Sequence, residues 1–247
     1  MLCEDPQIEV TRVILSHGVT PDRKRIWNRK LRKTARIGLL GSLNGVRMRK
    51  WYKDREAGDL LELARANNVP VYKTPFTNSD DTRRLFRDAK ADLGLSLGNG
   101  FIAPSVFNIP KHGMINVHTE ILPRFQGAQG IIWAIYEGVR EVGFTIHQIN
   151  KQIDGGDIMF QDVLPMTLYP TLRETVEQNM AHIRRCVPRA VCYVCRNYSE
   201  LKRNAHPQAG GTSYTTPSFL QFVRMMRNHR RFYRGSLSGE LTKDTRL

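Results

Sequence analysis

The strongest constraint on the fold is an alternation of short apolar runs with segments of helical spacing. Residues 93–100 (LGLSLGNG) and 113–118 (GMINVH) are nearly continuous apolar runs that end in glycine or polar residues, as is typical of buried parallel strands. Further strands are expected at 10–16, 69–75 and 143–149. Helical spacing is found at 57–68, 79–91 and 128–138, and Gly138 suits the residue that follows a helix. The pattern predicts a three-layer α/β fold with a mostly parallel sheet.

Two segments are harder to assign from their pattern. Residues 36–52 (RIGLLGSLNGVRMRKWY) fit either a strand with a glycine turn or a helix broken by glycines. Residues 171–195 have helical spacing, and Pro188 predicts a kink or a break within them.

The composition becomes polar from about residue 200, so we expect a main domain over residues 1–200 and a basic C-terminal extension over residues 201–247. Within the extension, Thr216 and Pro217 suit the N-cap and first position of a helix. Apolar residues and arginines fall on different faces of this helix: Phe219, Phe222, Val223 and Met226 on one, Arg224, Arg227, Arg231 and Arg234 on another. Such a helix fits either docking on the domain with a solvated charged face, or binding to RNA or a membrane.

The chain is strongly basic, with a formal net charge of +15 and a pI near 10. Residues 22–36 contribute eight Lys or Arg against one Asp, and a second basic cluster lies near the C-terminus. Such a charge attracts phosphates, nucleic acid or anionic membranes, so it indicates a class of partner but no reaction.

The apolar runs, the first residues and the cysteines indicate the cellular compartment of the protein. The apolar runs are far shorter than the roughly 20 residues of a membrane span, and the first residues lack the layout of a secretory signal, so we expect a cytoplasmic protein. Cys192 and Cys195 form a C-x-x-C, but no second such pair and no nearby His pair accompany them. We interpret them as buried apolar residues and expect no metal site.

Polar residues close the apolar run at 113–118. Asn116 and His118 are two residues apart, so in a strand they project from one face, at the carboxyl end where α/β sheets bind ligands. Asn offers an N–H to a developing oxyanion, and His can move a proton near neutral pH. A glycine-containing loop then returns with Asp154, whose carboxylate can orient His118 or accept a proton. Without a Ser or Cys nucleophile, the set favours direct group transfer.

These segments resemble a known family. GMINVHTEILPRFQG (113–127) and GFTIHQINKQIDGGDI (143–158) are similar to the paired signature of the folate-dependent formyltransferases: N-x-H, a following L-P and Gly, then a strand His and D-x-G-D. The family includes methionyl-tRNA, glycinamide ribonucleotide and sugar-nucleotide formyltransferases and formyltetrahydrofolate hydrolase. The resemblance covers roughly residues 69–200. It implies a Rossmann-like catalytic domain and transfer of a formyl group from 10-formyltetrahydrofolate to an acceptor amine.

The resemblance also implies roles for individual residues. Asn116, His118 and Asp154 are the expected catalytic residues, with His147 in support. Asn116 and His118 would stabilise the tetrahedral oxyanion, and Asp154 would assist proton transfer. The segment whose backbone holds the pterin in the family corresponds to Leu97, Gly98, Asn99, Gly100, Phe101 and Ile102.

Two features depart from the family pattern. Relatives usually have a small residue where this chain has Glu120, so we expect a more acidic and more crowded pocket beside His118. Relatives also begin with a strand and a helix before the strand that residues 10–16 resemble. That first strand lies centrally in the family's sheet, so its loss is expected to expose apolar edges and to invite pairing with another chain, as in a homodimer. Either the reading frame is truncated, or residues 36–45 replace the lost strand.

The preferred acceptor is an amino sugar carried on a nucleotide, because a short single-domain layout resembles those enzymes and a diphosphate suits a positive surface. Three alternatives stay open: an activity like that of methionyl-tRNA formyltransferase, hydrolysis of formyltetrahydrofolate, and a non-catalytic module that binds folate or nucleotide. The basic segments can also contact nucleic acid or an anionic membrane by charge.

Overall fold

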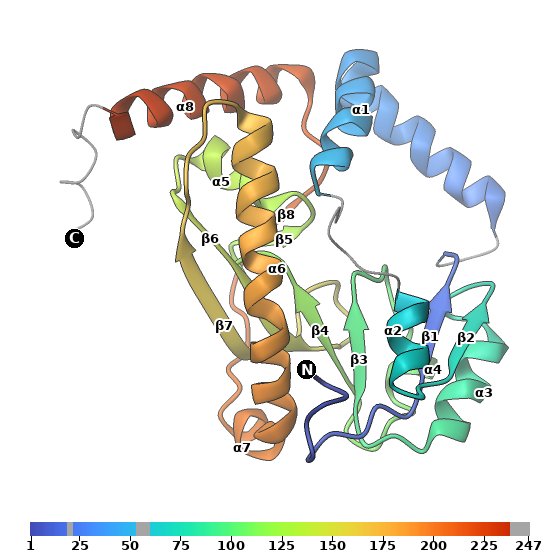
Figure 1. Cartoon of the computed structure of the whole chain (residues 1–247). Helices are drawn as coiled ribbons and strands as arrows, with labels where there is room; N and C mark the ends of the chain where they lie inside the picture. The colour runs from blue at the N-terminus through green and yellow to red at the C-terminus, as the bar shows by residue number, and fades with distance from the viewer. Residues whose placement is uncertain (19–21, 53–59, 238–247) are drawn as a thin grey trace.

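The computed structural model describes residues 1–18, 22–52 and 60–237. Strands and helices alternate through most of this chain (Figure 1), as predicted. In order, the elements are β1 (Val13–Ser16), α1 (Arg23–Arg49), the 3-10 turn η1 (Lys50–Tyr52), α2 (Leu60–Ala66), β2 (Val71–Thr74), α3 (Asp80–Ala89), β3 (Gly94–Leu97), α4 (Pro104–Phe107), β4 (Met114–His118), β5 (Phe125–Gly127), α5 (Gly130–Glu137), β6 (Glu141–Gln148), β7 (Ile158–Pro165), α6 (Leu172–Arg196), α7 (Tyr198–Arg203), β8 (Thr212–Tyr214) and α8 (Phe219–Leu237).

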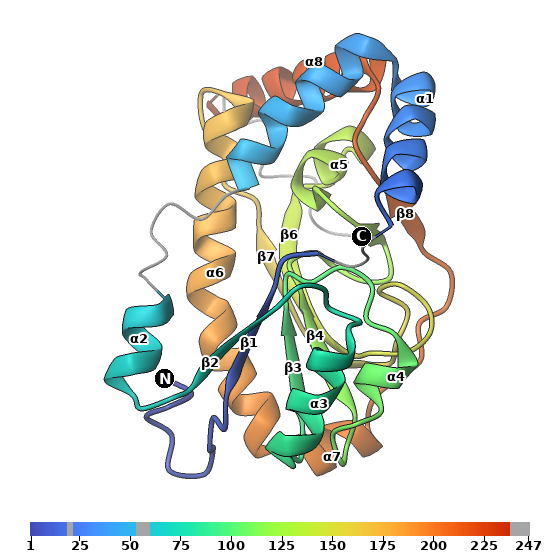
Figure 2. The same cartoon turned by 90° about the vertical axis from the view of Figure 1, so that its right-hand side faces the viewer.

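A four-stranded sheet with the order β3-β4-β6-β7 forms the centre of the molecule. β3 and β4 are parallel, whereas β6 runs antiparallel to both β4 and β7. Helices α6 and α2 lie on one side of the strands and α3 and α4 on the other (Figure 2). The strand residues that face α5 and α6 form an apolar core. Ile115, Phe144 and Ile146 are examples, and their side chains are almost wholly inaccessible to solvent. The predicted α/β architecture is confirmed.

The first two strands stand apart from this sheet. β1 and β2 form a parallel pair of their own, with Val13 opposite Val71. Among the described residues, no strand pairing joins β1 to β3, so each keeps one unpaired edge. This division agrees with the expected lack of a central strand. Pairing of these edges with a second chain stays a prediction.

Residues 36–45 do not replace the missing strand, because they lie within helix α1. Gly38 has φ 74° and ψ 169°, which breaks the helical geometry at that residue, so the broken-helix alternative is the one observed. Beyond this break, Gly41 and Gly45 face α8 and the chain before it: a Cβ on Gly45 would lie 2.3 Å from Thr216 Cγ2. The absence of a side chain at these glycines therefore permits close packing of α1 against a segment distant in sequence.

Helix α6 is a single element that continues through Pro188, so the alternative of a break is wrong. Its N-terminus is a capping box formed by Thr171 and Glu174. Cys192 is buried in this helix, and burial raises the pKa of the Cys195 thiol to about 11. Neither thiol forms a disulfide with another described cysteine.

The C-terminal residues pack on the rest of the molecule. β8 pairs with β5, and α8 packs against α1 and α5. α8 begins at Phe219, and the Ser218 hydroxyl accepts a hydrogen bond from Gln221 N. Ser218 therefore caps the helix, and the predicted N-cap at Thr216 is wrong. The division of the chain at residue 200 stays a prediction.

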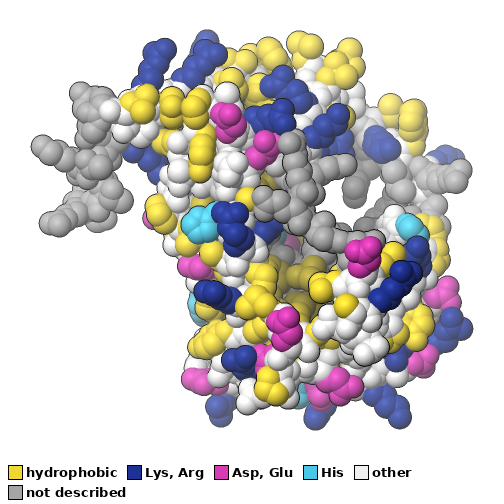
Figure 3. Space-filling model, viewed as in Figure 1, with side chains coloured by type: hydrophobic (Ala, Val, Ile, Leu, Met, Phe, Trp, Pro, Cys, Tyr) yellow, Lys and Arg dark blue, Asp and Glu magenta, His cyan; other side chains and the backbone are white. Residues whose placement is uncertain are grey.

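Basic side chains gather on one part of the surface. Figure 3 shows them beside hydrophobic side chains along the upper edge of the molecule, over α1 and α8. Within the described ranges, no helix is both long enough and apolar enough to cross a bilayer.

Candidate active site

Strand β4 presents the two polar residues that the sequence singled out. In the sheet, Asn116 lies opposite His147 of β6, and His118 lies opposite Thr145. Because side chains alternate along a strand, these four residues share one face of the sheet. The predicted placement of Asn116 and His118 side by side is confirmed.

His118 is buried between two carboxylates. Its Nε2 lies 3.0 Å from the carbonyl oxygen of Phe125 and 3.2 Å from Glu120 Oε2, and its Nδ1 lies 3.6 Å from Asp154 Oδ1. A ring nitrogen facing a carbonyl must carry the hydrogen, so Nε2–H donates to Phe125. In the neutral ring Nδ1 is then the free acceptor, and it faces Asp154. Nδ1 is therefore the ring nitrogen that is available to accept a proton, and it is the nitrogen nearer to Asp154.

Asp154 reaches His118 through a loop with unusual backbone geometry. Its own φ is 53°, in the left-handed region, and its Oδ2 accepts a hydrogen bond of 3.0 Å from Gly127 N. Further along the loop, a Cβ on Gly156 would lie 1.7 Å from the carbonyl oxygen of Gln148. Only glycine permits this approach of the loop to β6. The sequence-based role of glycine in bringing Asp154 to the site therefore has a direct structural basis.

His147 orients Asn116. Its Nδ1–H donates to the carbonyl oxygen of Gln148 (2.8 Å), which leaves Nε2 to accept from the Asn116 amide (3.3 Å). Burial lowers the pKa of His147, so the neutral ring that accepts this bond is favoured. One N–H of the Asn116 amide is thereby used, and the second can serve a bound oxygen atom.

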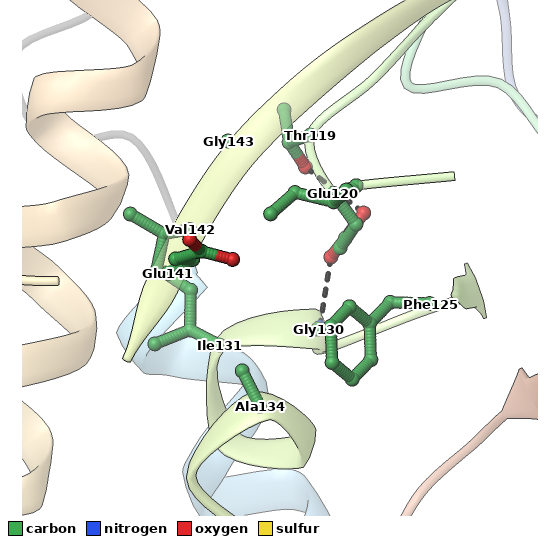
Figure 4. Close-up of a pocket in the computed structure, with 10 residues that line it drawn as sticks. Thr119, Glu120, Phe125, Gly130, Ile131, Ala134, Glu141, Val142 and Gly143 are labelled. Carbon is green, nitrogen blue, oxygen red and sulfur yellow. Dashed lines mark hydrogen bonds between the residues drawn. The ribbon is translucent and has the colours of Figure 1, made fainter. Parts of the chain in front are cut away.

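Glu120 is buried and turned toward the start of α5. Its Oε1 accepts a 2.9 Å hydrogen bond from Gly130 N, and Thr119 Oγ1 donates to Oε2 (3.4 Å; Figure 4). A Cβ on Gly130 would lie 2.0 Å from Glu120 Cγ, so this glycine makes the room. The adjoining pocket has room for about one water molecule. The expected acidic, crowded surroundings of His118 are present, although the carboxylate is held by a backbone N–H.

The loop expected to hold the pterin follows β3. Leu97 pairs with Val117 of β4, so the loop begins beside His118 at the carboxyl edge of these parallel strands. Its residues Leu97 to Phe101 are exposed, whereas Ile102 is buried. Asn78 fixes the far end of the loop, because its amide donates to the carbonyl oxygen of Phe101 and accepts from Ala103 N. Exposed apolar side chains and an exposed backbone suit a flat ring with a polar edge.

One residue near the site was missed by sequence reasoning. Gln129 is only 7% exposed and has φ 68°, and in the described part of the chain neither its amide oxygen nor its amide nitrogen has a partner. Buried amides are nearly always hydrogen-bonded, so this side chain is suited to a bound molecule. Nothing in the local sequence marks it, because its burial depends on tertiary packing. No group of His, Cys, Asp or Glu in the described ranges forms a metal site.

Several solved structures match this chain at low identity and with TM-scores below 0.5. A sugar N-formyltransferase from a Shewanella species matches with 14% identity over 89% of this chain and 88% of that chain, at a TM-score of 0.49. The phosphoribosylglycinamide formyltransferase of Streptococcus pneumoniae matches with 24% identity over 57% of this chain and 82% of that chain, at a TM-score of 0.46. The formyltransferase PseJ of Anoxybacillus kamchatkensis matches with 17% identity over 94% of this chain and 93% of that chain, at a TM-score of 0.44.

The sequence itself provides the firmer assignment. The family model described as formyl transferase matches residues 53–191, which is more than half of the chain and includes Asn116, His118 and Asp154. The protein therefore belongs to the formyl transferase family of enzymes.

Proposed function

We propose that this protein transfers a formyl group from 10-formyltetrahydrofolate to the amine of an amino sugar carried on a nucleotide. The observation that supports the reaction best is the cluster at the end of β4. There an oriented amide, Asn116, lies on the same face as His118, whose free Nδ1 faces Asp154. An oxyanion donor next to a proton acceptor is what attack of an amine on a formyl carbon requires.

In the proposed reaction, the acceptor nitrogen forms a bond to the formyl carbon, and the bond from that carbon to the folate nitrogen breaks. The second N–H of Asn116 stabilises the negative charge that develops on the formyl oxygen. His118 accepts the proton that the amine loses, at Nδ1, and Asp154 stabilises the resulting cation at 3.6 Å. The same proton is returned to the departing folate nitrogen, so no net proton is consumed.

The formyl donor is assigned to the loop Leu97–Ile102. When bound, it supplies an activated one-carbon group. The exposed side chains of Leu97 and Phe101 can cover a flat pterin, and the backbone of the exposed residues Gly98 to Gly100 can hydrogen-bond to its edge. This placement puts the donor beside His118.

Exposed cations near the site suggest only the general class of the acceptor, a molecule that carries phosphate. Arg124 follows β4 within the loop that reaches Phe125, and Lys151 lies on the loop that carries Asp154; both are exposed. These two cations can hold a diphosphate close to the site, and the unpaired amide of Gln129 can bind a sugar hydroxyl. A cytoplasmic location, where nucleotide sugars are made, stays part of this proposal.

The test is an acceptor screen with purified protein and 10-formyltetrahydrofolate. It compares 4-amino sugar nucleotides, methionyl-tRNA and glycinamide ribonucleotide, and follows tetrahydrofolate release and the mass of the product. We expect formylated sugar nucleotide, with a loss of about 100-fold or more in kcat/KM for His118→Ala and Asp154→Asn. The exposed His182→Ala is the matched control.

Each other outcome contradicts a named part of the proposal. Formate released without an acceptor indicates hydrolysis. Transfer to methionyl-tRNA alone means that the acceptor is methionyl-tRNA and not an amino sugar nucleotide. Folate binding without turnover indicates a binding module. Unchanged turnover in His118→Ala means that the assigned site is wrong.

A further inference from the structure

The excess of positive over negative charge in this protein lies in two helices. α1 contains ten Lys or Arg and α8 contains five, and neither contains an acidic residue. The rest of the chain has equal numbers, 23 basic and 23 acidic residues, so these two helices account for the whole net charge of +15. They pack against each other on the molecule. Together they form what we call the α1–α8 surface.

This surface also exposes large apolar side chains. Beyond the break at Gly38, α1 buries one face through Gly41, Gly45 and Met48. Its opposite face points outward and is apolar, and the adjacent start of α8 adds a further leucine. The outward residues are 50–80% exposed: Leu39, Leu40, Leu43, Val46 and Leu220. Exposed apolar patches of this kind mark interaction sites in folded proteins.

The first part of α1 combines the same two properties. Trp27 and Leu31 are one helical turn apart and are 62% and 52% exposed, and Lys24 and Lys30 beside them are also exposed. A Trp flanked by cations is typical of residues at the interface between lipid and water.

The two helices are held in place by contacts that leave the outer face free. Gly41 approaches Phe219 N of α8 closely, since a Cβ there would lie 3.4 Å away. Arg36 Nη2 donates to Thr215 Oγ1 (3.2 Å), and Lys33 Nζ donates to Thr216 Oγ1. The apolar ridge and the cations are therefore presented together, as Figure 3 shows over these helices.

We propose that the α1–α8 surface binds the surface of an anionic lipid bilayer. Cations alone would equally suit a nucleic acid, but phosphate backbones offer no apolar partner for a ridge of aliphatic side chains. A bilayer offers both, because headgroups attract Lys and Arg while the acyl boundary accepts Leu and Trp. The binding is interfacial, with α1 lying along the membrane plane.

Vesicle binding by the full-length protein tests this proposal. Sedimentation with phosphatidylcholine vesicles is compared with sedimentation with vesicles that also contain phosphatidylglycerol. We expect binding to the anionic vesicles only, weakened at least about 30-fold by Leu39→Ser/Leu43→Ser. The matched control is Leu60→Ser/Leu63→Ser, which changes two exposed leucines on α2.

A second set of variants tests whether vesicle binding depends on the positive charges of the α1–α8 surface. Arg227→Gln/Arg230→Gln on α8 should weaken vesicle binding about fivefold per charge, whereas Arg84→Gln/Arg87→Gln on α3 should leave it within about twofold. All four arginines are exposed, so far-UV circular dichroism should be unchanged in every variant.

Three results would overturn the proposal: no vesicle binding by the folded protein, vesicle binding that does not depend on Leu39 and Leu43, or binding to poly(U) RNA without binding to vesicles. The last result would assign the surface to nucleic acid. None of these readouts depends on formyl transfer, so failure here is distinct from failure of the proposed activity.

Discussion

Thr145 is the residue whose replacement tests the structure of the site most directly. It lies opposite His118 on β6 and is fully buried. Its hydroxyl donates to the carbonyl oxygen of Glu120 (2.8 Å) and accepts from Leu122 N (3.1 Å) and Gln161 Nε2 (2.8 Å). These bonds hold the loop after β4 whose residue Phe125 accepts from His118. Thr145→Val keeps the shape of the side chain and removes all three.

The expected cost follows from the groups left without a partner. Gln161 Nε2 retains its bond to the carbonyl oxygen of Leu122 (2.7 Å), so it is still satisfied. Leu122 N and the Glu120 carbonyl lose the partner supplied by Thr145. A buried polar group left unpaired costs about 1–3 kcal/mol, so with two such groups the free energy of unfolding should fall by about 2–6 kcal/mol. That is a large share of the roughly 5–15 kcal/mol of a typical domain.

Urea unfolding followed by circular dichroism measures this change, with Thr145→Ser as the matched control. Serine keeps the hydroxyl and loses one methyl group, at a cost of about 1 kcal/mol. The slope against urea should be the same in all three proteins, which shows that the same surface is exposed on unfolding. If Thr145→Val is as stable as Thr145→Ser, the hydroxyl does not hold this loop and the argument fails.

Three further predictions concern protonation, loop geometry and the unpaired amide. Burial lowers the pKa of His147 and of His229, so the unfolded chain takes up protons first. The free energy of unfolding should therefore be constant above about pH 7 and decrease as the pH falls below about 6.5; an increase in urea midpoint over that range would contradict this. Gly156→Ala should lower kcat/KM by about tenfold or more, because the new Cβ meets the Gln148 carbonyl at 1.7 Å; an unchanged rate would show that the loop adapts. Gln129→Leu should raise the free energy of unfolding by about 1 kcal/mol and raise KM for the acceptor; a loss of stability in urea would indicate that the amide is satisfied.

The parts of the fold that depend on local pattern were predictable. Alternation along β4 placed Asn116 and His118 on one face, and Gly138 ends α5 in the left-handed conformation, as its position suggested. In both cases the cause lies within a few residues of the feature. Such causes are visible in a sequence because they depend on backbone geometry and on the period of the side chains.

The parts that depend on distant contacts were not predictable. Gly41 and Gly45 allow α8 and the residues before it to pack closely on α1, and no local pattern predicts that contact. Ser218 and not Thr216 caps α8, because the helix begins at Phe219, and Thr216 instead accepts a hydrogen bond from Lys33 on α1. The orientation of β6, antiparallel to β4, depends likewise on the whole sheet.

The structure shows where the excess positive charge of the chain lies relative to the candidate active site. In the described part of the chain, the carboxylates of Glu120 and Asp154 are paired with backbone N–H groups and His118, and with no Lys or Arg. The site is therefore acidic, although the protein is strongly basic, because the excess cations lie on α1 and α8. A phosphate-bearing acceptor would be held by a few local cations, such as Arg124, and not by the field that the composition suggests. Charge and catalysis in this chain are separate properties of separate surfaces, so variants of one should leave the other intact.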